Sequence, residues 1–316
     1  MPHTILVTGS LTYDLFFAYE GSFRDGVSRA DPDRLSLCFV ARDHARAHGG
    51  TGANIAWNLR LLREEPLLVG TVGHDGEPYR RMLQESGISA RNIEVVPGHA
   101  TSTAVISTDS GERQITFFHP GADAHGSWPA SHLDPSALSC AIAAPRDVRV
   151  TMEALAWCHD RGVPCVFDPG QNILCFTVDD LRRALRMCAG LIVNASEWEI
   201  LVSRLSSSLP DVLATTPWVV ITRGADGCSV HTREDSLTLP ACPAATVVDP
   251  TGAGDAFRAG LLAGISKEWA LSDGCKLGAA LAAKVVGQRG GLLPACNLDE
   301  VFQTVRTVYG GVPACV

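Results

Sequence analysis

The chain of 316 residues is poor in lysine and lacks the patterns that define several large enzyme classes. Only three lysines occur, Lys267, Lys276 and Lys284, and none of them follows a glycine. A P-loop kinase needs G-x-x-x-x-G-K-[ST], so that class is excluded. The residues Gly9-Ser-Leu-Thr do not supply the G-x-G-x-x-G of a Rossmann dehydrogenase. A serine hydrolase would need an elbow such as G-x-S-x-G, which is also absent.

Signals for export and for membrane insertion are missing as well. No apolar stretch reaches the length of about 18 residues that a membrane span needs. Residues 4–9 are typical of a first strand, because an export signal begins with basic residues and continues with a longer apolar run. The eleven cysteines form no C-x-x-C pair, and their odd number favours reduced thiols. We therefore expect a cytoplasmic protein with no membrane partner.

Length and charge narrow the class further. A net charge of −8 argues against a nucleic-acid partner, which would require a basic face. A chain of 316 residues can bury a sizeable core without disulfides or structural metals. We expect one domain over residues 1–316, consisting of a large α/β body and a small attachment.

Strand-like and helix-like segments alternate through most of the chain. Strands are expected at 4–9, 67–72, 164–168, 191–193 and 217–222, and helices at 147–161, from near Ser196, and at 253–265, 271–287 and 298–308. Such alternation indicates βαβ units. It predicts a doubly wound, mostly parallel sheet flanked by helices.

Two regions interrupt this alternation. Residues 12–20 and 35–42 are strand-like with no helix expected between them, and 102–108 with 113–119 predict a hairpin around Asp109-Ser-Gly111. These pieces predict a small antiparallel sheet beside the main body, formed by about 12–20, 35–48 and 100–120. A sheet of this kind usually serves as a lid or as a dimer surface, because its edges and faces need covering.

The most informative stretch is Asp249-Pro-Thr-Gly-Ala-Gly-Asp255-Ala-Phe. The small residues Gly252, Ala253 and Gly254 leave their backbone N–H groups unobstructed at the start of an apolar helix, which is a typical anion site. Asp255 follows in the first helical turn. Phosphoryl transfer needs charge neutralised on the phosphate oxygens and a carboxylate that accepts the proton of the attacking hydroxyl. A Gly-rich turn with an ordinary acidic first-turn residue is the alternative explanation.

This stretch resembles the C-terminal signature of the ribokinase family, also called the PfkB carbohydrate kinases. The resemblance extends along the chain through four segments: Gly9-Ser10 with Asp14, Gly49-Gly-Thr-Gly-Ala-Asn54, Asn194-Ala-Ser-Glu197 and Thr222-Arg-Gly224. It implies an ATP-dependent kinase with an alcohol acceptor, in which Asp255 is the general base and the amides of Gly252–Gly254 form the anion hole.

The resemblance also implies roles for individual residues. The acceptor would contact Ser10, Asp14, Ser36, Gly49, Gly50, Asn54, Phe118 and Gln171. ATP would lie near Asn194, Thr222, Gly224 and Gly227, with Glu197 helping indirectly to place Mg²⁺. In this family, residues equivalent to Asp249 and Thr251 often hold a monovalent cation such as K⁺. From the residues alone, Asn194 and Glu197 could equally form an ordinary helix cap, and Phe118 could belong to the core.

Three segments are similar to those of bacterial adenosine and nucleoside kinases: residues 35–39, 115–122 and Phe167-Asp-Pro-Gly-Gln171. In that subgroup the lid aromatic, Phe118 in this chain, stacks on the base. Some adenosine kinases carry a second stacking Phe where this chain has Thr103, Ala104 and Val105, so the preferred nucleoside stays open. A sugar kinase of the same family and a catalytically silent binding protein are the alternatives. The family also forms homodimers through the lid.

Overall fold

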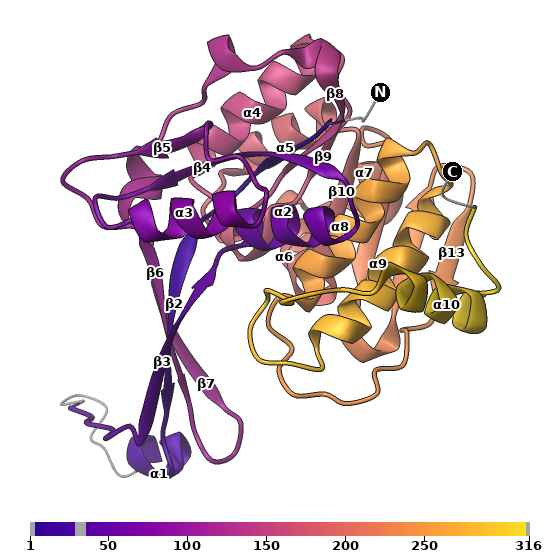
Figure 1. Ribbon diagram of the computed structural model, residues 1–316. Coiled ribbons are helices and arrows are strands. Elements are labelled where there is room, and N and C mark those ends of the chain that lie inside the picture. The colour runs from indigo at the N-terminus through magenta and orange to yellow at the C-terminus, as the bar shows by residue number, and fades with distance from the viewer. Residues whose placement is uncertain (1–3, 29–35, 314–316) are drawn as a thin grey trace.

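The computed structural model describes residues 4–28 and 36–313, and its helices flank a large central sheet (Figure 1). In the described residues this sheet has nine strands in the order β13-β12-β11-β10-β9-β8-β1-β4-β5. Their bounds are β1 Thr4–Thr8, β4 Glu65–Val72, β5 Ile93–Val95, β8 Leu138–Ala143, β9 Cys165–Phe167, β10 Gly190–Asn194, β11 Trp218–Thr222, β12 Cys228–Thr232 and β13 Ser236–Leu239. The strands from β5 to β11 are parallel, and β12 and β13 are antiparallel.

Helices cover both faces of this sheet, as a doubly wound fold requires. One face carries α2 (Thr51–Leu61), α3 (Glu77–Glu85), α8 (Ala253–Ser266), α9 (Leu271–Val285) and α10 (Leu298–Tyr309). The other carries α4 (Val148–Asp160), α5 (Val178–Met187), α6 (Ala195–Leu205) and the short α7 (Leu209–Leu213). Along β1 the alternation is direct, since Ile5 and Val7 join the first core and Leu6 joins the second. The predicted α/β architecture is confirmed.

Within the described ranges, no helix has the length and apolar character needed to cross a bilayer. Short 3₁₀ turns complete the connections. They are η2 (Gly121–His125), η3 (Ala130–His132), η4 (Pro135–Ala137), η5 (Gly170–Leu174) and η6 (Gly224–Asp226).

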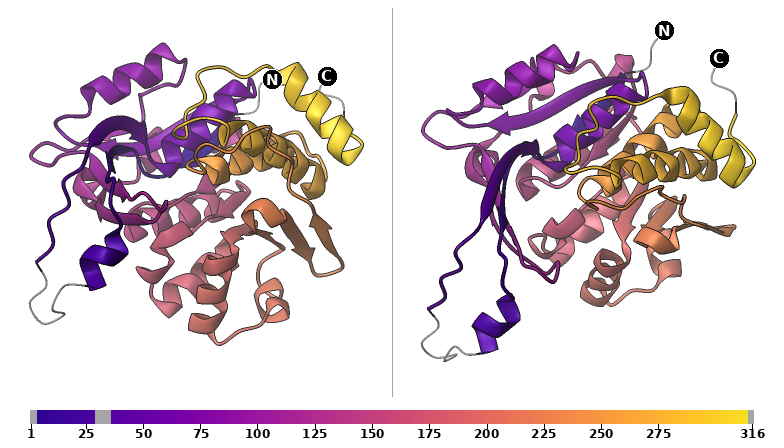
Figure 2. Two further views of the ribbon diagram at one scale, coloured as in Figure 1. Left: turned by 90° about the horizontal axis from the view of Figure 1, so that it is seen from below. Right: turned by 60° about the horizontal axis from the view of Figure 1, so that its bottom comes forward.

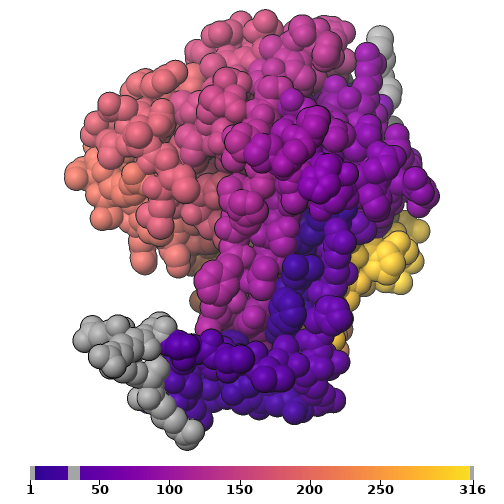
Figure 3. All heavy atoms as spheres, turned by 90° about the vertical axis from the view of Figure 1, so that its left-hand side faces the viewer, coloured from indigo at the N-terminus to yellow at the C-terminus, as the bar shows by residue number. Residues whose placement is uncertain are grey.

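The second sheet extends from the body as a narrow arm (Figures 1 and 3). Its strands are β2 (Thr12–Ala18), β3 (Asp43–Gly49), β6 (Ser102–Thr108) and β7 (Gln114–His119), in the order β3-β2-β6-β7. The outer pairs β3–β2 and β6–β7 are antiparallel, and the middle pair β2–β6 is parallel. The predicted hairpin is therefore present. The two views of Figure 2 show the same arm standing off the body, with α1 (Phe23–Ser28) near its far end.

The arm departs from expectation at that far end. The strand expected at 35–42 is wrong for the described residues 36–42, because β3 begins only at Asp43. The helix α1 also lies where none was expected. The physical reason is an aromatic cluster: Phe39 packs on Tyr19 and Phe23, with ring centroids 5.0 Å apart in each pair. Phe39 is therefore part of this aromatic cluster at the far end of the arm.

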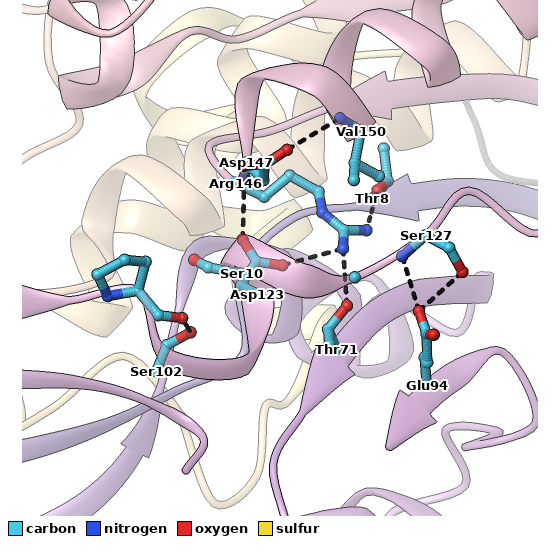
Figure 4. A network of polar contacts seen from close by, with 12 residues as sticks. Thr8, Ser10, Thr71, Glu94, Ser102, Asp123, Ser127, Arg146, Asp147 and Val150 are labelled. Carbon is cyan, nitrogen blue, oxygen red and sulfur yellow. Dashed lines mark hydrogen bonds and ion pairs between the residues drawn. The ribbon is translucent and has the colours of Figure 1, made fainter. Parts of the chain in front are cut away.

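A buried network ties the base of the arm to the central sheet (Figure 4). Asp123, which follows β7, accepts a hydrogen bond of 2.9 Å from the buried Arg146. The same guanidinium donates to Thr8 at the end of β1 and to Thr71 in β4, at 3.0 and 2.8 Å. Asp123 also accepts from the backbone N–H of Asp147. The return strand of the arm is thereby fixed to the carboxyl ends of three central strands.

Candidate active site

Several of the predicted residues lie at the carboxyl edge of the central sheet, where the helices α2 and α8 begin. The chain reverses its strand order beside β1, and ligands of open α/β sheets bind in the crevice at such a point. Gly9 and Ser10 leave β1, and Asp168 leaves β9. The first turn of α2 supplies Asn54 and that of α8 supplies Asp255. This edge is the candidate active site.

The turn before α8 has the geometry of an anion site. Gly252 is the N-cap and lies in the left-handed region with φ 79°. A Cβ added to it would meet Cα of Gly291 at 2.3 Å, so only glycine fits there. Both oxygens of Asp249 accept backbone hydrogen bonds of 2.9 Å, from Thr251 and from Gly290. Asp249 thus joins the two loops that shape the turn.

The pKa of Asp249 reflects this arrangement. Burial alone would raise that pKa, but the N–H groups of Gly290 and Thr251 outweigh burial and hold it below its usual value. The carboxylate is consequently ionised. Its oxygens already serve the two loops, and a monovalent cation at Asp249 and Thr251 stays a prediction.

Asp255 lies one residue inside the turn and is held from across the site. Asn54 of α2 donates a hydrogen bond of 2.7 Å from Nδ2 to Oδ2 of Asp255, although 201 residues separate them in the sequence. Burial raises the pKa of Asp255 to about 6, against the lowering effect of Arg258 and of the Asn54 amide. A carboxyl with such a pKa is ionised at neutral pH and still accepts a proton readily, which suits a general base.

Asp14 lies on β2 of the arm, and its charge interacts with that of Asp255. Burial raises the pKa of Asp14 to about 7, and the charges of Asp255 and Asp249 add to this effect. The carboxylate lies over Gly49 on the neighbouring strand, where an added Cβ would meet its Oδ2 at 2.0 Å. The Gly49 carbonyl accepts a hydrogen bond from the buried Tyr79 hydroxyl. The first glycine of the pair therefore makes room for the carboxylate.

Gly50 and Ser10 determine how the chain enters α2. Gly50 is the N-cap with φ 95°, and a Cβ there would meet the Ser10 carbonyl oxygen at 2.5 Å. That carbonyl accepts from Gly52 N–H at 3.1 Å, and the Ser10 hydroxyl accepts from Thr51 N–H at 3.2 Å. Ser10 thus satisfies the free amides of the helix start. Its predicted contact with substrate is not tested by these bonds.

The arm brings one predicted residue into line with Asp14. Asp14 pairs with Ala104, and Ala104 pairs with Phe118, so the three lie side by side across β2, β6 and β7. Phe118 is 45% exposed and so does not belong to the core. Two other predicted residues are exposed and lie outside this row: Ser36 before β3 and Gln171 on η5.

The expected nucleotide side lies farther along the same edge. Asn194 and Thr222 are neighbours at the ends of β10 and β11. Asn194 and Glu197 form a capping box, in which Asn194 Oδ1 accepts from Glu197 N–H at 2.8 Å and Glu197 Oε2 accepts from Asn194 N–H at 2.7 Å. Burial raises the pKa of Glu197, with a further rise from Asp168. The capping explanation is thus correct, and a magnesium role would use the remaining oxygen.

Glycines shape the loop after β11. Gly224 and Gly227 adopt φ values of 56° and 84°. A Cβ on Gly227 would meet the Leu239 carbonyl oxygen at 2.0 Å, which explains the glycine there. The loop therefore turns tightly beside Thr222.

Sequence reasoning missed a buried ion pair at the site. Arg258 lies one helical turn after Asp255 and donates from Nε and Nη2 to the two oxygens of Asp168, the second bond measuring 2.7 Å. Its Nη1 also donates to the Gly254 carbonyl at 3.1 Å. A signal was present, because Arg258 lies among the apolar and small residues that follow Asp255 in α8, and Asp168 directly follows a buried strand.

In the described part of the chain, no cluster of three or more His, Cys, Asp or Glu side chains could hold a metal ion. Mg²⁺ in nucleotide sites is held mainly by substrate phosphates, with one or two protein carboxylates. Glu197 with its single uncommitted oxygen fits that indirect arrangement.

With this geometry established, known proteins offer a comparison. Residues 3–296 match the pfkB family of carbohydrate kinases. A nucleoside kinase from Methanothermobacter thermautotrophicus is 31% identical over 270 residues, covering 84% of this chain and 87% of that one. A fructokinase from Salmonella typhimurium is 31% identical over 247 residues, covering 69% and 76%. The structure of Burkholderia thailandensis nucleoside kinase in complex with inosine matches with a TM-score of 0.88 at 30% identity, covering 99% of this chain and all of that one.

The fold and the site define a phosphotransferase with an alcohol group as acceptor. The chain belongs to the pfkB (ribokinase) family of carbohydrate kinases. Its predicted likeness to the nucleoside kinases within that family is confirmed.

Proposed function

We propose that this chain is an ATP-dependent nucleoside kinase that phosphorylates the 5′-hydroxyl of adenosine or a related nucleoside. The observation that carries this proposal is the row Asp14–Ala104–Phe118 beside Asp255. Neighbouring strands lie about 4.8 Å apart, so Asp14 and Phe118 are separated by about 10 Å. Ribose hydroxyls on Asp14 would then place the base near Phe118. The small Ala104 leaves space between them, and the likeness to an inosine-bound kinase agrees with this arrangement.

The residues of the chain would act as follows. Asp14, Gly50 and Asn54 hold the ribose and bring its 5′-hydroxyl toward Asp255. The γ-phosphate of ATP rests on the amides from Gly252 to Gly254, whose donors and helix dipole stabilise its charge. Asp255 takes the hydroxyl proton as the oxygen attacks phosphorus.

The other groups on the nucleotide side support ATP binding. Asn194, Thr222, Gly224 and Gly227 bound the proposed ATP site, and Mg²⁺ neutralises charge on the phosphates when bound. A K⁺ ion at Asp249 and Thr251 is part of the proposal. This ion predicts a higher rate in potassium chloride than in choline chloride at equal ionic strength. Equal rates would refute the cation site.

The proposed base is tested by Asp255→Asn. We expect kcat to fall by about 10²–10⁴-fold, the usual contribution of a general base, while nucleoside affinity measured by calorimetry stays within a few-fold. The matched control is Asp273→Asn, since Asp273 also lies in the first turn of a helix, away from the site. Loss of binding with a normal residual rate would contradict the assigned role of Asp255.

The acceptor class needs its own assay, because a fructokinase is as similar in identity as the nucleoside kinase. We expect adenosine or another nucleoside to give the highest kcat/KM in a panel with inosine, guanosine, cytidine, ribose and fructose. Phe118→Ala should then reduce kcat/KM for nucleosides more than for ribose. A preference for fructose or ribose would establish the sugar-kinase alternative, and turnover of none would favour a silent binding protein.

We also propose that the arm is a lid and a dimer surface. The arm face opposite Asp14 carries the apolar side chains Leu15, Phe17, Val105, Ile115 and Phe117, together with polar ones such as Arg46 and His44 on β3. Phe117 is 71% exposed. A second copy of this chain would cover this face. Light scattering should show a dimer that Phe117→Arg dissociates and Val95→Arg, on the body, does not. Closure of the lid predicts slower proteolysis of the arm with nucleoside bound.

The cysteines of the described residues are all free thiols, which supports a cytoplasmic protein. Fractionation of the source cells should recover the protein with the cytoplasm, and recovery elsewhere would refute this part.

A further inference from the structure

The ion pair between Arg258 and Asp168 lies directly beneath the anion turn. Both side chains are almost completely shielded from water, with 9% exposure for Arg258 and none for Asp168. The guanidinium donates three hydrogen bonds, two to the oxygens of Asp168 and one to the Gly254 carbonyl. A Cβ added to Gly254 would meet Nη1 of Arg258 at 2.9 Å. The guanidinium is therefore in contact with the backbone whose amides form the anion site.

Stability alone does not explain such a pair. Buried ion pairs lose so much hydration that well-packed apolar residues of similar volume are often equally stable. The surroundings would allow that exchange, because the neighbouring α8 residues Phe257, Leu261 and Leu262 are buried and apolar. The pair instead connects the end of β9 at the sheet edge with the first turn of α8. The proposed reaction requires a fixed position of these two segments relative to each other.

The ion pair also affects the protonation of Asp255. Arg258 on its own helix lowers the pKa of Asp255 and Asp168 from β9 raises it, both against a background of burial. The charge of Asp255 contributes to the raised pKa of Asp14 on β2. The charge of Glu197 on α6 also favours the cationic form of Arg258 by raising its pKa. Arg258 is thus a cation among carboxylates at the centre of the site.

We propose that Arg258 and Asp168 form a positioning pair that fixes the anion turn against the sheet edge, and that Arg258, held by this pair, favours the carboxylate form of Asp255. The two hydrogen bonds to Asp168 determine where the guanidinium lies. The guanidinium then orients Gly254 through its carbonyl and places a positive charge near Asp255. Neither residue needs to touch the substrate. The inference rests on the proposed role of Asp255 as base.

The test is the pH dependence of kcat for four variants: Arg258→Met, Arg258→Lys, Asp168→Asn and the double variant Arg258→Met/Asp168→Asn. Saturating substrates isolate groups of the bound enzyme, in which the ribose covers Asp14. Thermal melting of each variant reports folding. Arg146→Met is the control, because it breaks the other buried ion pair at this sheet edge.

The single variants should move the acid limb of the profile in opposite directions. Removing the cation in Arg258→Met should displace it to higher pH by about 1 unit, the usual effect of one close opposite charge. Asp168→Asn should displace it to lower pH, and the double variant should lie between the two. Arg258→Lys keeps the positive charge but loses the paired hydrogen bonds to Asp168. The acid limb of its pH profile should therefore stay near that of the wild type, while KM for ATP rises. Arg146→Met should leave the limb in place.

The outcomes separate this inference from the proposed function. An unmoved acid limb in Asp168→Asn, together with an unchanged KM for ATP in Arg258→Lys, would overturn the positioning role while leaving Asp255 as base. These two conservative variants decide the matter even if Arg258→Met fails to fold. Near-normal turnover by Asp255→Asn would instead refute the proposed function itself.

Discussion

The substitution Gly49→Ala gives the sharpest test of how the arm holds the acceptor. Gly49 adopts an ordinary backbone conformation, so the change introduces no backbone strain. Its new Cβ would lie 2.0 Å from Oδ2, 2.7 Å from Cγ and 3.0 Å from Oδ1 of Asp14. Real Cβ atoms do not approach other atoms more closely than 3.0 Å. The Asp14 carboxylate must therefore move by about 1 Å, a misplacement that can cost about 10²-fold in rate.

We expect kcat/KM for the nucleoside to fall by about 10²-fold in Gly49→Ala, and KM for ATP to stay unchanged. A coupled assay with either substrate varied separates the two constants. The control is Gly111→Ala at the hairpin turn of the same arm, where a Cβ meets only the flexible end of Arg113. In a double-mutant cycle, adding Gly49→Ala to Asp14→Ala should cost almost nothing more, because both changes remove the same interaction.

The result that would refute this reasoning is a Gly49→Ala enzyme within twofold of wild type while Asp14→Ala is strongly impaired. Asp14 would then bind substrate from a position that Gly49 does not control. Equal, additive losses in the cycle would refute it too, since they would assign independent roles to the two residues.

The pH dependence of Asp14 extends the same test. Because burial and the neighbouring carboxylates raise its pKa to about 7, Asp14 becomes protonated as the pH falls below 7. KM for the nucleoside should therefore increase as the pH is lowered from 8 to 6. A raised carboxyl pKa in the folded state also means that the charged form opposes folding, so stability falls as the pH rises from about 4 to about 7. Asp14→Asn should accordingly raise the melting temperature at pH 8 and lose nucleoside affinity.

Two further predictions concern the frame of the site. Arg146→Met should lower the free energy of unfolding by about 3–5 kcal/mol, because it leaves the Asp123 charge buried and unpaired. The control Arg149→Met, at a half-exposed arginine, should lower it by at most about 1 kcal/mol. Equal midpoints of the two variants in urea denaturation would contradict this. Gly252→Ala should reduce kcat by about 10²-fold or more, since it displaces the anion-site amides. The control is Gly310→Ala, because Gly310 has the same φ of 79° but open space around it. This control variant should keep the wild-type rate. Equal kinetics for the two glycine variants would show that the turn geometry is unimportant.

Features that depend on residues close in sequence could be predicted. The alternation of short apolar strands with helices gave the parallel sheet, and Asp109-Ser-Gly111 gave the hairpin of the arm. The turn from Gly252 to Gly254 was predictable because the conformations available to glycine and the free amides of a helix start are local properties. The capping box of Asn194 and Glu197 is local for the same reason. The expected end of the strand series at residue 222 was wrong, since β12 and β13 extend the sheet as an antiparallel edge.

Other features depend on the packing of distant segments, and the sequence alone did not determine them. Asn54 reaches Asp255 across 201 residues, and Arg258 reaches Asp168 across 90. The first contact exists because the helices α2 and α8 start at one sheet edge, and the second because β9 ends at that edge. The sequence by itself therefore determined the kinase family and the local anion turn. The tertiary structure decided which side chains surround Asp255, because the charge and burial that set its pKa come from segments that only folding brings together.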